Sequence, residues 1–217
     1  MERDFSRWLD MFNPELHEDK KVGIIWAGGI GSNSAYALAK MGIKVKVCDF
    51  DAVDTVNTSS QFYSMEQLWK PKVEMLKENI KRMCDEDIEI VNDKYKPEYF
   101  EDCQILILAL DSLAVRKEVI EKCKDDQFIL DTRMVKKISQ INTLYGFQRD
   151  TRMEKEWVET ADAENANTRC TEKAVAFNAL GMACLVGSLV VDYLNGKTLK
   201  YSYWLDLENY RLNVFNS

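Results

Sequence analysis

One stretch near the N-terminus, residues 20–51, most restricts the fold that this chain can adopt. A short apolar run, 22–26, is followed at once by glycines and then by helical spacing of apolar residues over 32–41. A second, alternating run, 44–48, comes next and ends at Asp49. This order predicts strand, glycine turn, helix and strand, the βαβ unit of a parallel sheet. Backbone N–H groups and the positive end of the helix then point at one place, which suits a phosphate group.

The glycine turn differs from the usual dinucleotide fingerprint at its first position. That fingerprint is G-x-G-x-x-G with an acidic residue about 20 residues further on. Trp26 stands where the first glycine is expected, and Gly28, Gly29 and Gly31 follow. Asp49, at the tip of the second strand, is placed to bind ribose hydroxyls. The alternative is a glycine-tolerant turn that binds no ligand. Residues further along the chain are needed to distinguish the two.

The composition is that of an ordinary globular protein and argues against several classes. A chain of 217 residues with 46% hydrophobic and 30% charged residues fits one α/β domain with a full core. The net charge of −7 argues against a nucleic-acid partner. The longest apolar stretch, 179–191, is shorter than the about 20 residues of a membrane span, so we expect a core helix and no membrane association. The charged N-terminus shows no signal-peptide pattern, so we expect a cytoplasmic protein with reduced thiols.

Cysteine and histidine usage argues against a zinc site. The chain has six cysteines without a C-x-x-C pair, and a single histidine. Four cysteines lie in apolar settings, and we expect them to be buried: Cys48, Cys103, Cys123 and Cys184.

The rest of the chain continues the alternation of strands and helices. We expect an amphipathic arm over 1–20, a crossover loop over the polar stretch 149–172 and a terminal hairpin over 198–216. The sequence therefore predicts a single α/β domain over 1–217: a Rossmann-like, mostly parallel sheet flanked by helices, with antiparallel strands added in the C-terminal half. The other expected strands are 88–92, 104–110, 128–131 and 138–147, and the other expected helices are 71–83, 112–123 and 173–194.

Polar side chains gather where the expected strands end. Asp49 and Asp51 follow the second strand, Asp111 follows the most apolar strand, and Lys72 begins a helix. Carboxylates suit ribose hydroxyls or Mg²⁺, and a lysine can balance triphosphate charge. This set fits Mg–ATP better than NAD, which needs neither the lysine nor a second carboxylate. Asn57, Gln61 and Arg116 complete the set.

With these residues the chain resembles the ThiF/MoeB/HesA superfamily, whose fold is shared with the ubiquitin-activating enzymes. The resemblance covers nearly the whole chain and is closest to the shorter prokaryotic and phage-type members. The matching segments are 26–32 (glycine loop), Asp49-Phe-Asp51 with Asn57 and Gln61 (D-x-D…N-x-x-R-Q), Lys70-Pro-Lys72 (G-x-x-K), Asp111-Ser with Arg116 (D-(S/N)-x-x-x-R), Phe5-Ser-Arg7 (R-(Y/F)-x-R-Q), 131–134 and Cys170-Thr.

The resemblance implies an ATP-dependent adenylation. A carboxylate, typically the C-terminal glycine of a ubiquitin-like or sulfur-carrier protein, attacks the α-phosphate of ATP, and acyl-adenylate and pyrophosphate form. It implies Mg²⁺ at Asp111, a catalytic Lys72, and a homodimer in which Arg7 reaches the other subunit's nucleotide. Cys170, which follows Arg169 and precedes an expected helix, is the candidate to take the acyl group as a thioester. The implied nucleotide contacts are Gly28, Gly29, Gly31, Asp49, Asp51, Asn57, Gln61, Lys72 and Asp111.

Three departures from the family pattern keep other functions open. Trp26 replaces the first glycine, Ser60 replaces the arginine before Gln61, and Trp8 replaces the glutamine after Arg7. A non-catalytic subunit that serves as a dimerisation scaffold is therefore the second hypothesis. The third is an NAD-binding Rossmann protein, for which the chain offers no acid–base pair, because its only histidine lies in the N-terminal arm.

Overall fold

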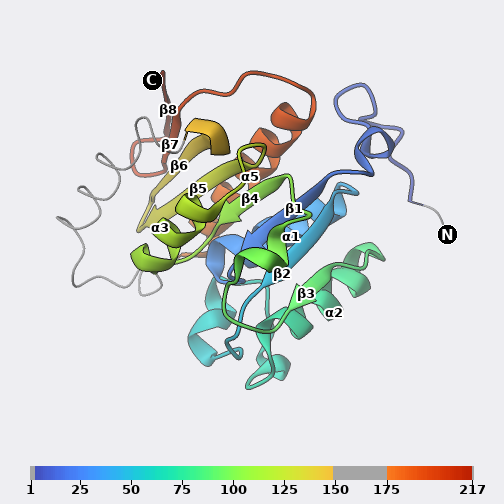
Figure 1. Cartoon of the computed structure of the whole chain (residues 1–217). Helices are drawn as coiled ribbons and strands as arrows, with labels where there is room; N and C mark the ends of the chain where they lie inside the picture. The colour runs from blue at the N-terminus through green and yellow to red at the C-terminus, as the bar shows by residue number, and fades with distance from the viewer. Residues whose placement is uncertain (1–2, 149–174, 217) are drawn as a thin grey trace.

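The computed structural model of the chain, which describes residues 3–148 and 175–216, contains one eight-stranded sheet (Figure 1). The strand order is β3-β2-β1-β4-β5-β6-β7-β8. The first five strands in this order are parallel, and β6, β7 and β8 are added in antiparallel pairs. The strands are β1 Lys21–Ile25, β2 Lys44–Cys48, β3 Glu89–Val91, β4 Ile105–Leu108, β5 Phe128–Val135, β6 Ile138–Tyr145, β7 Ser202–Asp206 and β8 Arg211–Phe215.

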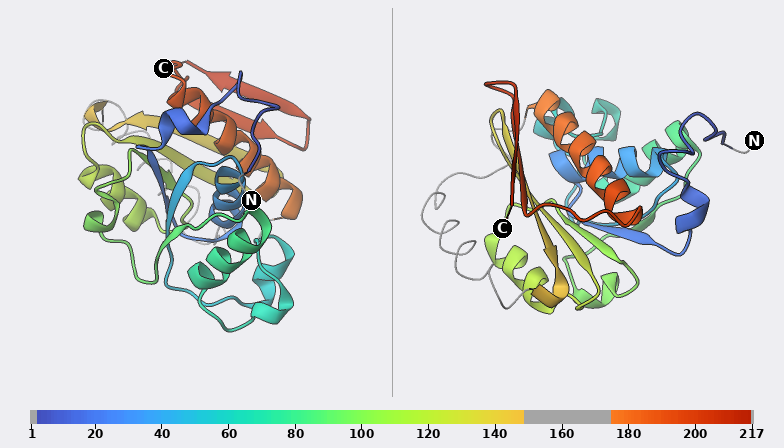
Figure 2. Two further views of the ribbon diagram at one scale, coloured as in Figure 1. Left: turned by 90° about the vertical axis from the view of Figure 1, so that its right-hand side faces the viewer. Right: turned by 90° about the horizontal axis from the view of Figure 1, so that it is seen from above.

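Helices cover both faces of the parallel part (Figure 2). The helices α1, α2 and α5 pack on one face and contribute to the larger core cluster, while α3 packs on the opposite face with the smaller cluster. Alternate residues of β4 belong to the two clusters, because successive side chains of a strand point to opposite faces. The helices are α1 Gly29–Lys40, α2 Lys72–Cys84, α3 Leu113–Lys122 and α5 Ala176–Leu194.

The expected fold class is confirmed, with a mostly parallel sheet and antiparallel strands in the C-terminal half. The βαβ unit is found with β2 at its expected bounds, and the hairpin expected over 198–216 corresponds to β7 and β8. Strand β5 is four residues longer than expected, because beyond Asp131 it continues to pair with β6 as far as Val135 opposite Ile138. The crossover loop expected over 149–172 lies outside the described residues.

The described part of the expected arm, 3–20, forms turns and a short 3-10 helix, Pro14–His17, and it buries Phe12. One local expectation is corrected. Cys184 is exposed, whereas Cys48, Cys103 and Cys123 are buried. The reason is that α5 packs on α1 and the sheet with one side only, and Cys184 lies on the other side with Phe177 and Leu180.

Helix α5 contains the apolar run 179–191 and lies within the helix expected over 173–194. It spans 19 residues, and among the described helices it is the one long and apolar enough to cross a membrane by length and composition. Half of that stretch is buried inside the fold, and a core helix of a soluble protein meets the same criterion.

Candidate functional site

The turn between β1 and α1 carries a strained residue at its first position. Trp26 has φ +76°, in the left-handed backbone region that residues other than glycine adopt at a cost of roughly 1–3 kcal/mol. Its N–H donates to the carbonyl oxygen of Cys48 (2.8 Å), which ties the turn to the end of β2. The tight turn also explains Gly31, because a Cβ there would lie 1.9 Å from the carbonyl oxygen of Trp26.

Side chains from two later segments hold the turn in place. The Ala27 N–H donates to Oδ2 of Asp49 (2.7 Å), and the Tyr63 hydroxyl donates to the Ala27 carbonyl oxygen (2.8 Å). The other Asp49 oxygen accepts the N–H of Asp51 (2.8 Å). Burial raises the pKa of Asp49, and it outweighs the lowering by Lys72 and these two hydrogen bonds. Asp49, expected as a ribose ligand, therefore already uses both oxygens to organise the loop, and Tyr63 is a part of the site that the sequence analysis missed.

The N-terminus of α1 opens onto this turn. The helix begins at Gly29, and its N-cap, Gly28, has no side chain to satisfy the first N–H groups. A Cβ on Gly28 would meet nothing within 4 Å, so the space beside it is open. Open space next to unsatisfied N–H groups at a helix N-terminus suits a phosphate group.

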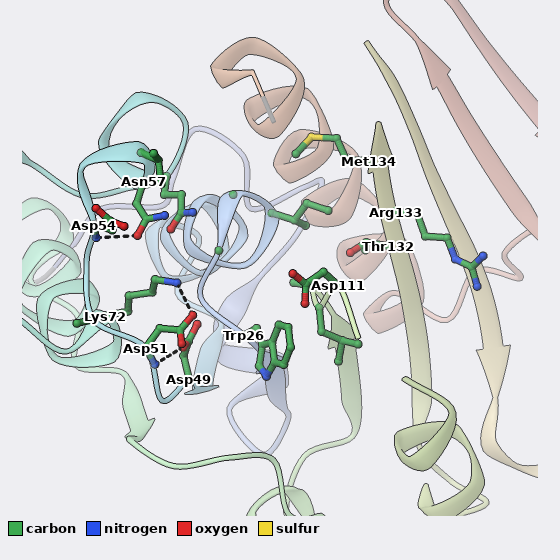
Figure 3. Close-up of a pocket in the computed structure, with 18 of the residues that line it drawn as sticks. Trp26, Asp49, Asp51, Asp54, Asn57, Lys72, Asp111, Thr132, Arg133 and Met134 are labelled. Atoms are coloured by element: carbon green, nitrogen blue, oxygen red, sulfur yellow. Dashed lines mark hydrogen bonds and ion pairs between the residues drawn. The ribbon is translucent and has the colours of Figure 1, made fainter. Parts of the chain in front are cut away.

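A pocket of about 530 Å³ lies at the carboxyl ends of the parallel strands (Figure 3). Its volume is in the range of about 300–1,000 Å³ that is usual for small-molecule sites. The structure brings eight of the nine expected nucleotide contacts to its wall, since Gly31 alone does not line it. The lining residues are Trp26, Gly28, Gly29, Ile30, Asp49, Asp51, Ala52, Asp54, Val56, Asn57, Gln61, Lys72, Ala109, Leu110, Asp111, Arg116, Thr132, Arg133 and Met134.

Lys72 is buried at the first position of α2 and pairs with Asp51 across the pocket wall. The Lys72 Nζ lies 2.9 Å from Oδ2 of Asp51, and its backbone N–H donates to the Asp51 carbonyl oxygen (2.9 Å). Asp51 is about half exposed, at 52%, against 8% for Lys72. The cation is thus fixed in position, while its carboxylate partner can turn to solvent or to a ligand.

Asp111 follows β4 and has a half-buried carboxylate that lines the pocket. Among the described residues its side chain makes no hydrogen bond or ion pair with the protein. The next residue, Ser112, accepts the N–H of Val115 (3.3 Å) and caps α3, which fixes the backbone at this point. A partnerless carboxylate at a fixed position is available to a ligand or a metal ion.

Arg116 was expected among the polar residues of the nucleotide site, but its contacts are with the protein itself. It is buried and forms an ion pair with Asp131 on β5, and its guanidinium donates to the carbonyl oxygens of Leu108 (3.4 Å) and Leu110. Arg133 pairs with the same Asp131 carboxylate (Nε to Oδ2, 3.0 Å). These contacts tie the end of β4, just before Asp111, to β5. Asp131 is completely buried, and the sequence signal for it was its place in the 131–134 segment.

The loop after β2 supplies two side-chain amides to the pocket wall, those of Asn57 and Gln61. Asn57 Oδ1 accepts the N–H of Asp54 (2.8 Å), and the two residues form the capping box of a 3-10 helix, Thr55–Ser59. Gln61 is half-buried, and its Oε1 is buried without a hydrogen-bond partner. A buried acceptor without a donor costs about 1–3 kcal/mol, and none of the described residues supplies that donor to Gln61, so a ligand hydroxyl or N–H could satisfy it.

Of the other expected catalytic residues, one lies away from this pocket and one is outside the part of the chain that the structure describes. Arg7 is exposed on the N-terminal arm and does not line it. Cys170 lies outside the described residues.

Known proteins resemble the chain in sequence and in fold. The SUMO-activating enzyme subunit uba-2 of Caenorhabditis elegans is 34% identical over 121 residues, 50% of this chain and 21% of that protein. Ubiquitin-like modifier-activating enzyme 5 of Aedes aegypti is 24% identical over 191 residues, 86% of this chain and 45% of that protein. The chain therefore spans less than half the length of these two curated relatives.

The similar solved structures share the fold at low identity. Escherichia coli MccB, solved with AMPCPP and MccA, has a TM-score of 0.73 and 16% identity, over 94% of this chain and 65% of MccB. PaaA has a TM-score of 0.73 and 19% identity over the same shares. The model of the ThiF family matches residues 10–216, nearly the whole chain, and the chain therefore belongs to the ThiF family.

Proposed function

We propose that this protein binds Mg–ATP in the pocket and adenylates the C-terminal carboxylate of a ubiquitin-like protein, a sulfur-carrier protein or a peptide. The observation that carries the proposal is the Asp111 carboxylate, which has no partner among the described side chains and faces the same pocket as the α1 N-terminus and Lys72. Two relatives are named as activating enzymes for SUMO and for a ubiquitin-like modifier, and MccB was solved with ATP.

The residues present fit a triphosphate and a magnesium ion. Gly28 leaves open space for phosphate oxygens beside the α1 N-terminus, and Gln61 Oε1, which has no donor among the described residues, suits a ribose hydroxyl. Mg²⁺ is usually bound by one or two carboxylates together with phosphate oxygens and water, which matches Asp111. Bound Mg²⁺ would neutralise charge on the phosphates. Asp111 would hold it, and Lys72 would bind phosphate oxygens, with its Asp51 partner turning away.

The negative charge of the pocket wall implies that ATP binds only together with a divalent cation. Four carboxylates line the pocket, those of Asp49, Asp51, Asp54 and Asp111. The lining cations are already paired, Lys72 with Asp51, and Arg116 and Arg133 with Asp131. ATP without a divalent cation would meet net negative charge at short range, so we expect its binding to depend on Mg²⁺.

The reaction needs positioning and charge neutralisation rather than a protein acid or base. A carboxylate oxygen of the acceptor attacks the α-phosphorus, the bond from that phosphorus to the bridging oxygen breaks, and pyrophosphate leaves with the electron pair. No proton is transferred in this step. The α1 N-terminus and Lys72 would stabilise the charge that develops on the phosphate oxygens.

Further parts of the proposal rest on the family resemblance. Cys170 would accept the acyl group as a thioester, and AMP would leave. Arg7 would reach the nucleotide of a second subunit in a homodimer, which agrees with its exposed position outside the pocket of its own chain. A cytoplasmic location stays a prediction.

Calorimetric titration with ATP, with and without Mg²⁺, tests the nucleotide site. We expect binding that requires Mg²⁺ and is weakened at least about tenfold in Asp111→Asn. Glu118→Gln removes a carboxylate from α3 at a residue that does not line the pocket, and it should bind ATP normally. A folded protein that does not bind Mg–ATP at millimolar concentration would instead support the scaffold hypothesis.

A further inference from the structure

The strain at Trp26 calls for a function of its side chain. The position has φ +76°, where glycine would be unstrained. The turn keeps this conformation because neighbouring contacts determine it, above all the hydrogen bond from Trp26 to the Cys48 carbonyl oxygen. Strained residues of this kind cluster at ligand-binding sites.

The indole of Trp26 lines the pocket instead of turning away from it. Figure 3 shows it between Asp49 and Asp111, at the carboxyl ends of β1, β2 and β4. Among the described residues it is the only aromatic side chain in the wall. It is half-buried, and Phe50 packs edge-on against it from outside the pocket, with ring centroids 6.2 Å apart and an interplanar angle of 79°.

The surroundings of the indole divide the pocket into two parts. On the apolar side, Trp26 packs against the smaller core cluster, which contains Leu110, another residue of the pocket wall. The α1 N-terminus at Gly28 and the Lys72 cation make up the polar part. An aromatic face next to a phosphate-binding part suits a ligand that joins a flat base to phosphate groups.

We propose that Trp26 is a stacking platform for the base of the bound nucleotide and so determines that this pocket selects base-bearing triphosphates. The inference rests on the proposed function, because it assigns a part of the same ligand. Phe50 holds the indole from the outer side and does not itself reach the pocket. The platform uses the face of a residue whose backbone position would otherwise favour glycine.

Two ligands separate the contribution of the base from that of the phosphates. The full chain is titrated with Mg–ATP and with Mg–tripolyphosphate, which carries the same phosphate chain without a base. We expect Trp26→Leu to bind Mg–ATP about 5- to 150-fold more weakly, the usual range for loss of one stacked base, and to bind Mg–tripolyphosphate within about twofold of the original. Trp26→Phe should retain part of the ATP affinity. Trp69→Leu is the matched control, because Trp69 is a second tryptophan with a left-handed backbone (φ +69°) that is exposed and does not line the pocket, and it should stay near the original affinity for both ligands.

Fluorescence gives a second readout that does not depend on turnover. The chain has five tryptophans, so the emission of Trp26 is isolated by difference from Trp26→Phe. Mg–ATP should quench this part of the emission and Mg–tripolyphosphate should not. Trp26→Phe also serves if Trp26→Leu does not fold.

Three outcomes would overturn the platform. Tighter binding of Mg–ATP by Trp26→Leu or Trp26→Gly would mean that the indole crowds the nucleotide. Failure of the original protein to bind either ligand would overturn the proposed function together with the platform. If Asp111→Asn no longer binds either ligand while Trp26→Leu binds both with unchanged affinity, the proposed function stands and the platform alone is overturned.

Discussion

A Cβ atom on Gly31 would lie 1.9 Å from the carbonyl oxygen of Trp26. The turn from β1 into α1 is thus so tight that its first residue adopts a left-handed backbone and its last residue has no room for a side chain. Between them, Gly28 faces open space. The glycines of one loop therefore differ in their surroundings: Gly31 has no room for a side chain, and Gly28 borders open space in the pocket.

Substitution of these two glycines should separate stability from binding. Gly31→Ala forces a methyl group against the backbone and should destabilise the fold by about 1–3 kcal/mol or more. Gly28→Ala should change stability by no more than about 1 kcal/mol, because the new methyl group meets no atom within 4 Å. It should weaken Mg–ATP binding, because the methyl group enters the pocket. Urea unfolding and calorimetry measure the two effects, and normal stability of Gly31→Ala would contradict this geometry.

Substitution of Arg116 should mainly lower the free energy of unfolding. Removing it leaves the completely buried Asp131 carboxylate without one of its two cations and the carbonyl oxygens of Leu108 and Leu110 without a donor. Breaking such a buried pair costs about 3–5 kcal/mol. We expect Arg116→Ala to lose about this much in urea unfolding. Lys117→Ala removes an exposed helical pair with Glu121 and should stay within about 0.5 kcal/mol.

Mixed dimers test whether Arg7 acts across a subunit interface. Arg7→Ala and Asp111→Asn should each reduce ATP–pyrophosphate exchange with a carboxylate acceptor. In a mixed dimer, the Arg7→Ala subunit keeps Asp111 and receives Arg7 from its partner, so one intact site is restored. Recovery of exchange on mixing would support action in trans. Absence of recovery, with subunit exchange demonstrated, would assign Arg7 to its own chain or to no catalytic role.

Cys170 should affect only the step after adenylation. Cys170→Ala should remove a thioester that is sensitive to reducing agent and leave Mg–ATP binding unchanged. Cys184→Ala is the matched control, because this exposed cysteine lies on α5 and does not line the pocket. Intact-mass measurement after incubation with ATP and an acceptor would report the adduct. Loss of the adduct in Cys184→Ala instead would transfer the role to that residue.

A charge cluster at the opposite edge of the sheet predicts an acid dependence of stability. Asp102 lies 2.6 Å from the Nζ atoms of both Lys21 and Lys46. Burial raises its pKa, but the hydrogen bonds from the two lysines outweigh this and lower the pKa to about 2. Because the folded-state pKa lies below the usual 3.8, the ionised Asp102 stabilises the fold above about pH 4. This stabilisation is lost as the pH falls towards 2.

The size of this effect is limited by exposure. Asp102 is 49% exposed, so its contribution at neutral pH should be below about 1 kcal/mol. Asp102→Asn should therefore be slightly less stable than the original protein at pH 7 and approach it at about pH 2, by urea unfolding across this range. A difference that grows as the pH falls would contradict the sign. Mg–ATP binding at pH 7 should not change, because Asp102 does not line the pocket.

The sequence by itself determined the order of the elements and the place of the site. Buried parallel strands such as β4 are read from continuous apolar runs, and the glycine turn between β1 and α1 is read from local composition. The polar residues at strand ends followed from the same pattern, because parallel strands end at one edge of the sheet. These are properties of short segments, which a single sequence carries in full.

Only the tertiary structure decided which of these polar residues are already used within the protein. Asp49 holds the Ala27 N–H, 22 residues away, and Arg116 is paired with Asp131 on a neighbouring strand. The same holds for the direction of the Trp26 indole and for the exposure of Cys184. Side-chain partners come from segments that are distant in sequence, and local periodicity contains no information about which of them meet.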